Sequence, residues 1–166
     1  NCLGQPLLMK TVDLRLGIQA TQYLRRSEEV IKPRKQIAAS NDEAARTFIQ
    51  YKFPRNLRNL IAQEGRVLSR WGDAGWGRIV ADNKRAGRFS DELVIATAEM
   101  ITERWHPNPL PKWVCCVPSL NHPDLVPDFA KRLAIRLGLP FLDVVSKLRN
   151  NAPQKGQQNR FHQCRN

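Results

Sequence analysis

Apolar side chains recur three or four residues apart in five segments of the chain, which is the spacing of an amphipathic helix. The segments are residues 12–26, 56–71, 76–87, 90–105 and 127–137. Ser90 is placed to cap the fourth segment, with Asp91 and Glu92 in its first turn, and Gly138 directly follows the fifth. The pattern therefore predicts five helices, with a glycine-containing turn at residues 72–75 between the second and the third.

Two short, continuous apolar runs, residues 113–117 and 141–146, have the composition of strands covered on both faces. The fifth predicted helix connects them, which is the order of a right-handed βαβ unit. Residues 27–37 are a β-branched stretch broken by Pro33, typical of an edge strand or a wing-like hairpin. We predict an α/β C-terminal half with an incomplete parallel sheet, and a mostly α N-terminal half with a short β wing.

These elements divide the chain into two parts. Residues 1–55 hold the basic helix, the wing-like strand and a polar linker. Residues 56–166 hold the helical lead-in and the βαβ unit. The sequence begins with Asn1 instead of Met, and the predicted sheet has no further strands after residue 146. We therefore expect an internal or C-terminal fragment of a longer protein.

Charge is the strongest compositional signal. The chain has 27 Lys and Arg residues against 15 Asp and Glu, a formal net charge of +12. This surplus favours a polyanionic partner such as nucleic acid, and a solvated basic face without a partner is the alternative. No apolar run approaches the roughly 20 residues that a membrane-spanning helix needs. We expect a cytoplasmic protein without a membrane partner, in which the adjacent Cys115 and Cys116 are reduced thiols.

Cationic side chains gather at three places that suit phosphate. Those around the wing and at the end of the third predicted helix are predicted nucleic-acid contacts: Arg25, Arg26, Lys32, Arg34, Lys35, Lys84, Arg85 and Arg88. In the tail, Lys155, Arg160 and Arg165 alternate with Asn and Gln, and we predict a mobile flap there. Phosphate contacts position nucleic acid without reading bases, so DNA and RNA both stay open.

The loop after the first buried strand is a further candidate site. In open parallel sheets, ligands bind beyond the carboxyl ends of the strands. This place is occupied by Pro118, Ser119, Leu120, Asn121 and His122. Its backbone amides, with cations from the flap, could hold pyrophosphate or a phosphate ester, and a plain βα connection is the alternative.

Several catalytic motifs are absent from the sequence. There is no G-x-x-x-x-G-K-[ST] phosphate loop, no metal-ligand spacing of His and Cys, and no G-x-S-x-G turn at Ser119. The glycines of residues 72–77 form a G-x-x-G-x-G string between two predicted helices. That setting favours a turn in which Trp71 and Trp76 pack closely against each other. A dinucleotide-binding site is the less favoured interpretation, because such a site follows a strand. We predict no catalytic residue, no metal and no cofactor in this chain.

Five blocks of the sequence resemble bacterial RecQ-type DNA helicases that carry a C-terminal phosphoribosyltransferase-like region. The blocks are residues 25–37 (RRSEEVIKPRKQI), 65–80 (GRVLSRWGDAGWGRIV), 87–94 (GRFSDELV), 113–141 (WVCCVPSLNHPDLVPDFAKRLAIRLGLPF) and 153–166 (PQKGQQNRFHQCRN). From residue 113 onward the chain is also similar, more loosely, to the ComF group of phosphoribosyltransferase-fold proteins linked to DNA uptake.

The resemblance implies a parent enzyme that uses ATP and Mg²⁺ to separate DNA strands in repair or recombination, with this chain lying after the motor. It also implies that residues 118–120 correspond to a pyrophosphate-side loop and residues 153–165 to a mobile flap. The chain departs from both activities. It lacks the helicase phosphate loop, the Asp-Glu box and the zinc cysteines, and none of its acidic pairs has the setting of a phosphoribosyl-binding turn.

The expected function is therefore that of an accessory, DNA-contacting segment of a RecQ-like helicase. The alternative is a phosphoribosyltransferase-type domain that binds a pyrophosphate-containing sugar phosphate. A third interpretation is an interaction module that docks through Trp71, Trp76 and Trp105, but their helical spacing favours positions in the core.

Overall fold

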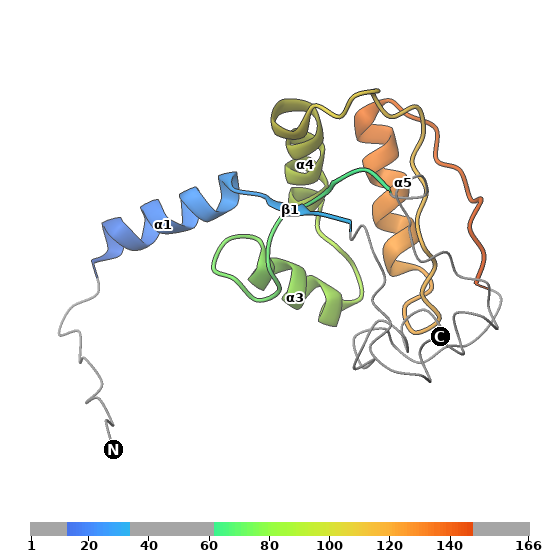
Figure 1. The fold of residues 1–166 in the computed structure, drawn as a ribbon. Helices are drawn as coiled ribbons and strands as arrows, with labels where there is room; N and C mark the ends of the chain where they lie inside the picture. The colour runs from blue at the N-terminus through green and yellow to red at the C-terminus, as the bar shows by residue number, and fades with distance from the viewer. Residues whose placement is uncertain (1–12, 34–61, 148–166) are drawn as a thin grey trace, which may run out of the picture.

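The computed structural model describes residues 13–33 and 62–147, which form a mixed α/β fold (Figure 1). Within these ranges there are four α-helices, one π-helix and one two-stranded antiparallel sheet. In chain order the elements are α1 (Leu14–Arg26), β1 (Glu29–Ile31), β2 (Gly65–Val67), α3 (Gly77–Ala86), α4 (Asp91–Glu99), the π-helix η1 (Met100–Trp105) and α5 (Leu125–Leu137). The predictions of helices at α1, α3, α4 and α5 are confirmed.

The sheet joins two segments that are distant in sequence. Glu29 pairs with Val67 and Ile31 with Gly65, so the wing-like strand predicted in residues 27–37 is confirmed at β1. Its partner β2 lies where we predicted a helix over residues 56–71, and that prediction is wrong in its described part. Glycine and β-branched residues are weak helix formers, and pairing with β1 overrides the helical spacing.

The core forms where α4 packs between α3 and α5. Trp76, Leu93 and Ala96 make one buried cluster, and Val94 and Leu133 belong to a second on the side of α5. Phe129 packs against both clusters. Two faces of α4 are therefore covered, and η1 continues this helix to Trp105, the end predicted from the sequence.

One side chain of α5 fastens that helix to the start of α4. The guanidinium of Arg132 lies 2.6 Å from a carboxylate oxygen of Asp91 and 2.6 Å from one of Asp128, and it donates to the carbonyl oxygen of Phe89 at 2.6 Å. Burial lowers the pKa of Arg132, but its hydrogen bonds to the two carboxylates outweigh this and raise the pKa overall. The side chain is therefore a permanently charged clamp.

The two strands predicted at 113–117 and 141–146 are present only as a single parallel bridge between Val114 and Phe141. Val114 donates to the carbonyl oxygen of Pro140 at 2.9 Å, and Leu142 donates to that of Val114 at 2.8 Å. Helix α5 connects the two segments, as expected for the βαβ order. Longer strands are not found in the described ranges, because an isolated parallel pair has too little cover to be stable.

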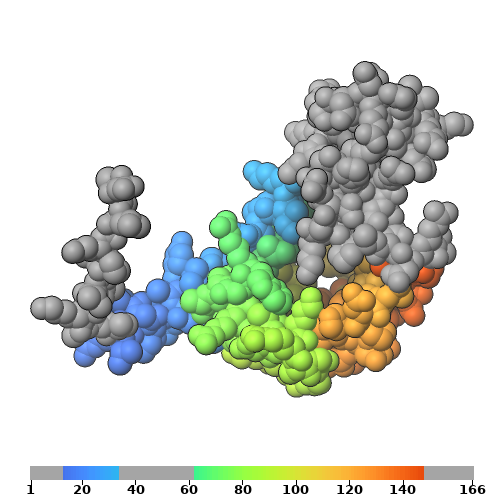
Figure 2. All heavy atoms as spheres, turned by 90° about the horizontal axis from the view of Figure 1, so that it is seen from below, coloured from blue at the N-terminus to red at the C-terminus, as the bar shows by residue number. Residues whose placement is uncertain are grey.

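Helix α1 extends away from the other described elements, as Figures 1 and 2 show. The carboxylate of Asp13 caps its start by accepting from Arg15 N and Leu16 N. None of the residues of α1 is buried. Within the described part of the chain, no helix has the length and apolar character to cross a membrane.

Candidate nucleic-acid interface

The cations predicted to contact nucleic acid differ in what they bind within the protein. Arg25, in the last turn of α1, is already engaged: its guanidinium lies 4.6 Å from the centre of the Trp76 ring and 3.3 Å from Glu92 Oε1. This side chain fixes the end of α1 to the body. Its charge is therefore only partly available to a ligand.

Arg26 and Lys32 are exposed, and neither makes an ion pair with a residue in the described ranges. Arg26 ends a polar stripe along α1 that sequence reasoning missed. The stripe consists of the exposed residues Arg15, Gln19, Gln22 and Arg26. Their spacing of four, three and four residues places them on one side of the helix. The spacing of these polar residues is visible in the sequence, but the helix was interpreted from its apolar side alone.

Two cations of the predicted cluster at the end of α3 have acidic neighbours at the surface. Arg85 lies 2.5 Å from Asp82, and Arg88 lies 3.7 Å from Asp91. Lys84 is different, because its Nζ lies 5.5 Å from the centre of the Trp71 ring. Lys84 is therefore the cation of this cluster that sits beside an aromatic ring instead of a carboxylate.

The loop between β2 and α3 is organised by one carboxylate. Asp73 accepts from the backbone amides of Arg70 at 2.8 Å, Gly75 at 2.9 Å and Gly77 at 2.9 Å. A Cβ on Gly77 would lie 1.9 Å from the carbonyl oxygen of Arg70, so only glycine fits there. Asp73 occupies the amides that a phosphate would use, which argues against anion binding at the start of α3.

This loop differs from its sequence-based interpretation in two respects. It follows a strand, whereas we predicted that its glycine string joins two helices. The predicted close packing of Trp71 and Trp76 is also wrong. Trp76 is 8% exposed in the core, and its indole donates to the carbonyl oxygen of Arg25, whereas Trp71 is 67% exposed. The turn thus places the Trp76 ring in the core and the Trp71 ring at the surface.

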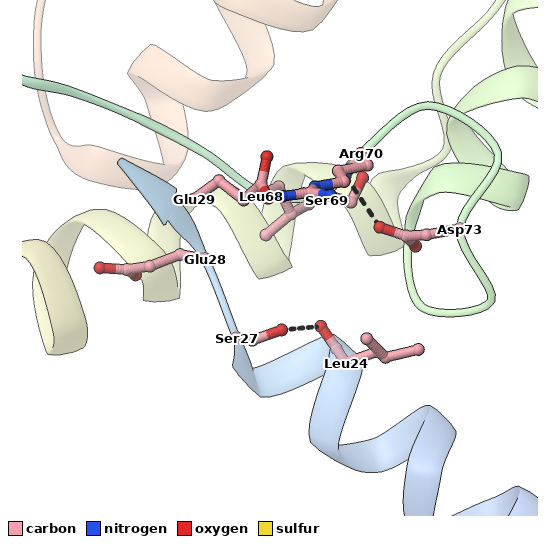
Figure 3. Close-up of a pocket in the computed structure, with 8 residues that line it drawn as sticks. All are labelled: Leu24, Ser27, Glu28, Glu29, Leu68, Ser69, Arg70 and Asp73. Carbon is pink, nitrogen blue, oxygen red and sulfur yellow. Dashed lines mark hydrogen bonds and ion pairs between the residues drawn. The ribbon is translucent and has the colours of Figure 1, made fainter. Parts of the chain in front are cut away.

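A hollow of about 270 Å³ lies between the end of α1, β1 and this loop (Figure 3). It is lined by Leu24, Ser27, Glu28, Glu29, Leu68, Ser69, Arg70 and Asp73. Arg70 pairs with Glu29, and Glu28 binds Arg66 at 3.3 Å and Arg104 at 3.4 Å. Because carboxylates outnumber cations in its lining, this hollow does not suit a phosphate group.

The candidate anion loop lies directly before α5. Pro118, Ser119 and His122 are half-buried, whereas Leu120 and Asn121 are exposed. The flap residues Lys155, Arg160 and Arg165 lie outside the described ranges, as do Arg34 and Lys35. The geometry thus shows where this loop lies in the fold, next to a helix N-terminus.

Two free cysteines, Cys115 and Cys116, lie shortly before this loop. Burial, Asp143 and Cys115 raise the pKa of the Cys116 thiol, and Lys131 opposes them. The raised pKa lowers the fraction of the reactive thiolate form of Cys116. Among residues 13–33 and 62–147, no cluster of three or more His, Cys, Asp or Glu side chains could hold a metal ion.

The charge of the chain is unevenly distributed. Residues 13–33 and 62–147 contain 16 Lys or Arg and 13 Asp or Glu, a surplus of three. Residues 1–12, 34–61 and 148–166 contribute the other nine of the net charge of +12. The folded part therefore supplies a few unpaired cations in defined places, and most of the surplus belongs to the segments that adjoin it.

Comparison of the chain with protein-family models, with curated proteins and with solved structures gives no match.

Proposed function

We propose that this chain is an accessory segment of a RecQ-like, ATP-dependent DNA helicase, and that it contacts the DNA backbone. One observation carries the proposal. Arg26 is the last residue of α1, and Lys32 directly follows β1. Both are exposed, and neither has an acidic partner in the described ranges. Both belong to the block at residues 25–37 that resembles this helicase family. ATP and Mg²⁺ would serve the motor of the parent enzyme and not this chain.

The polar stripe along α1 would extend these contacts along the DNA backbone. Arg15 and Arg26 are eleven residues apart, which corresponds to about 16 Å along a helix. Successive phosphates of one DNA strand advance by about 3.4 Å along the duplex axis, so the two arginines at the ends of the stripe are far enough apart to contact different phosphates. Arginines at its ends would bind phosphate, and Gln19 and Gln22 would donate to phosphate or sugar oxygens. Such contacts hold DNA of any sequence.

The test is a salt titration of binding to a labelled DNA duplex, followed by fluorescence anisotropy. Each phosphate contact contributes about 0.9 to the slope of log affinity against log salt. The double variant Arg26→Ala/Lys32→Ala should lower that slope by about two. The matched control is Lys112→Ala/Arg136→Ala, which removes the same charge from exposed positions away from the stripe and should change the slope less. Absence of binding by the wild type even in dilute buffer would refute the proposal.

A second candidate is a phosphoribosyltransferase-type domain, and a different observation favours it. The parallel bridge between Val114 and Phe141 brackets α5, and the loop at residues 118–122 leads from the first bridged segment into that helix. Ligands of open parallel sheets bind at this place. A longer chain, extended beyond residue 166, should bind phosphoribosyl pyrophosphate in calorimetry if this candidate is right. No heat of binding from the extended chain would reject it.

A further inference from the structure

We propose that Trp71 and Lys84 form a stacking site for an unpaired nucleobase, so that this chain binds single-stranded nucleic acid at the loop between β2 and α3. The inference rests on the proposed nucleic-acid binding. It adds a second binding site and specifies that the nucleic acid bound there is single-stranded. It is independent of the stripe along α1, because Trp71 and Lys84 belong to other elements.

The exposure of Trp71 is the first observation. Trp76, five residues later, is 8% exposed, but Trp71 is 67% exposed. Tryptophan offers the largest flat apolar surface of any side chain, and an exposed ring presents that surface to a partner. Figure 1 shows the loop that carries Trp71 standing out beside α3, away from α5. The ring is thus accessible to a large ligand.

The stiffness of the loop is the second observation. Trp71 is followed by Gly72, whose φ of 77° is in the left-handed region. The three backbone amides bound by Asp73 then close the turn. Contact between Gly77 and the carbonyl oxygen of Arg70 fixes the other end. A ring held on such a loop loses little freedom when a ligand stacks on it, which favours affinity.

The position of Lys84 is the third observation. Its Nζ lies 5.5 Å from the centre of the Trp71 ring, on the exposed side of α3. Arg85 and Arg88 nearby are paired with carboxylates, so Lys84 is the cation that this cluster offers to a phosphate. A base stacked on Trp71 carries its phosphate within a short distance of the ring. An aromatic platform beside a cation is the arrangement that single-stranded nucleic acid binds.

The chemistry selects an unpaired base over a duplex. Inside a duplex, each base face is covered by its neighbours, so a protein ring cannot stack on it without breaking that contact. An unpaired base offers a free face, and stacking tolerates any base because each has a π-system. The site would therefore hold a displaced single strand without sequence preference.

The experiment compares four forms of the full chain: wild type, Trp71→Ala, Trp71→Leu and Trp71→Phe. Each is titrated with labelled oligo(dT) and with a duplex. Trp71→Ala should weaken oligo(dT) binding about fivefold or more, the range expected for loss of one stacked base. Binding to the duplex should change less than twofold. Trp71→Phe should keep most of the affinity because it remains aromatic, and Trp71→Leu should resemble Trp71→Ala. All four should melt at similar temperatures, because residue 71 is exposed.

A charge variant and a spectroscopic signal complete the test. Lys84→Ala should lower the salt slope for oligo(dT) by about 0.7, with Lys112→Ala as the unaffected control. Oligo(dT) should quench the tryptophan fluorescence of the wild type more than that of Trp71→Phe, since stacking acts on the ring itself.

The outcomes separate this inference from the proposed function. If the wild type binds duplex but Trp71→Ala binds oligo(dT) as tightly as wild type does, the stacking site is refuted and backbone binding stands. If Trp71→Leu keeps full affinity, the contact is a general apolar one, and stacking is refuted. If the wild type binds neither nucleic acid, the proposed function and this inference both fall.

Discussion

Arg25 and Trp76 bind each other at two points although they are 51 residues apart. The guanidinium lies 4.6 Å from the centre of the indole ring, and the indole Nε1 donates to the Arg25 carbonyl oxygen at 2.9 Å. Arg25 is in the last turn of α1, and Trp76 caps the start of α3. With Leu24 against Gly75, this pair joins α1 to the body of the fold.

Trp76→Phe should destabilise the protein because it keeps an aromatic ring in the core but removes the donor to Arg25. We expect a loss of about 1–2 kcal/mol in the free energy of unfolding, and of about 3–5 kcal/mol for Trp76→Ala. Urea unfolding followed by circular dichroism measures both. Trp71→Phe is the matched control at an exposed ring and should change stability by about 0.5 kcal/mol or less. Equal stability of the two Phe variants would contradict the prediction.

Gly77→Ala should be among the most damaging single substitutions, since its Cβ would lie 1.9 Å from a backbone oxygen that cannot move freely. We expect a loss of about 3 kcal/mol or more, or a chain that fails to fold. Gly17→Ala is the matched control, because nothing lies within 4 Å of the added carbon. In the middle of α1, that change should stabilise the helix by about 0.5–1 kcal/mol. Thermal melting of both variants tests the prediction. Similar melting temperatures would show that a Cβ at residue 77 does not clash with the carbonyl oxygen of Arg70.

Arg132→Met should weaken the attachment of α5 to α4. The substitution keeps the length of the side chain but leaves Asp128 and the Phe89 carbonyl oxygen without their donor. Because Arg132 is 19% exposed and Asp91 is largely solvated, we expect a loss of about 1–3 kcal/mol and not the larger cost of a fully buried pair. Arg136→Met, at an exposed position on the same helix, should be nearly neutral. Denaturant midpoints for the two variants measure the difference.

The Cys116 thiol should react slowly with alkylating reagents at pH 8. Its pKa lies above the ordinary value of 9.0, so the thiolate fraction in the folded protein is below that of a free cysteine. Asp143→Asn removes one cause of the shift and should speed the reaction in a Cys115→Ser background. Mass spectrometry of the modified chain follows the rate.

The same shift gives a pH dependence with a defined sign. A folded-state pKa above the unfolded one makes the contribution of Cys116 to stability complete below the unfolded pKa and lost as the pH rises through the folded one. The free energy of unfolding should therefore fall at alkaline pH, and less so in Cys116→Ser. A fall of equal size in both forms would show that another group is responsible.

The sequence was sufficient to find α3, α4 and α5, because each buries one side. Helix α1, none of whose residues is buried, was found from its helical spacing alone. Gly138 ends α5 in the left-handed conformation, and Gly87 does the same for α3. Local spacing and a glycine stop are enough for such elements. The start of α4 at Asp91 was likewise predicted from the preceding Ser90.

The sequence could not reveal β2, because the strand exists through a partner far away. Apolar residues at helical spacing surround Gly65–Val67, and only pairing with β1 makes these residues extended. The exposure of Trp71 had the same origin. The helical pattern placed its ring in the core, but the turn after β2 points it outward. Ion pairs such as Arg85 with Asp82 also depend on side-chain geometry, which the sequence does not give.

Helix α1 contacts the rest of the described fold near its C-terminal end, at Arg25. Thirteen residues give it a length of about 20 Å, and its attachment to the rest of the fold lies at one end. A ligand bound along α1 would therefore contact a segment that meets the described core through the Arg25–Trp76 pair, and Trp76 belongs to the buried cluster that also holds Leu93 and Ala96 of α4.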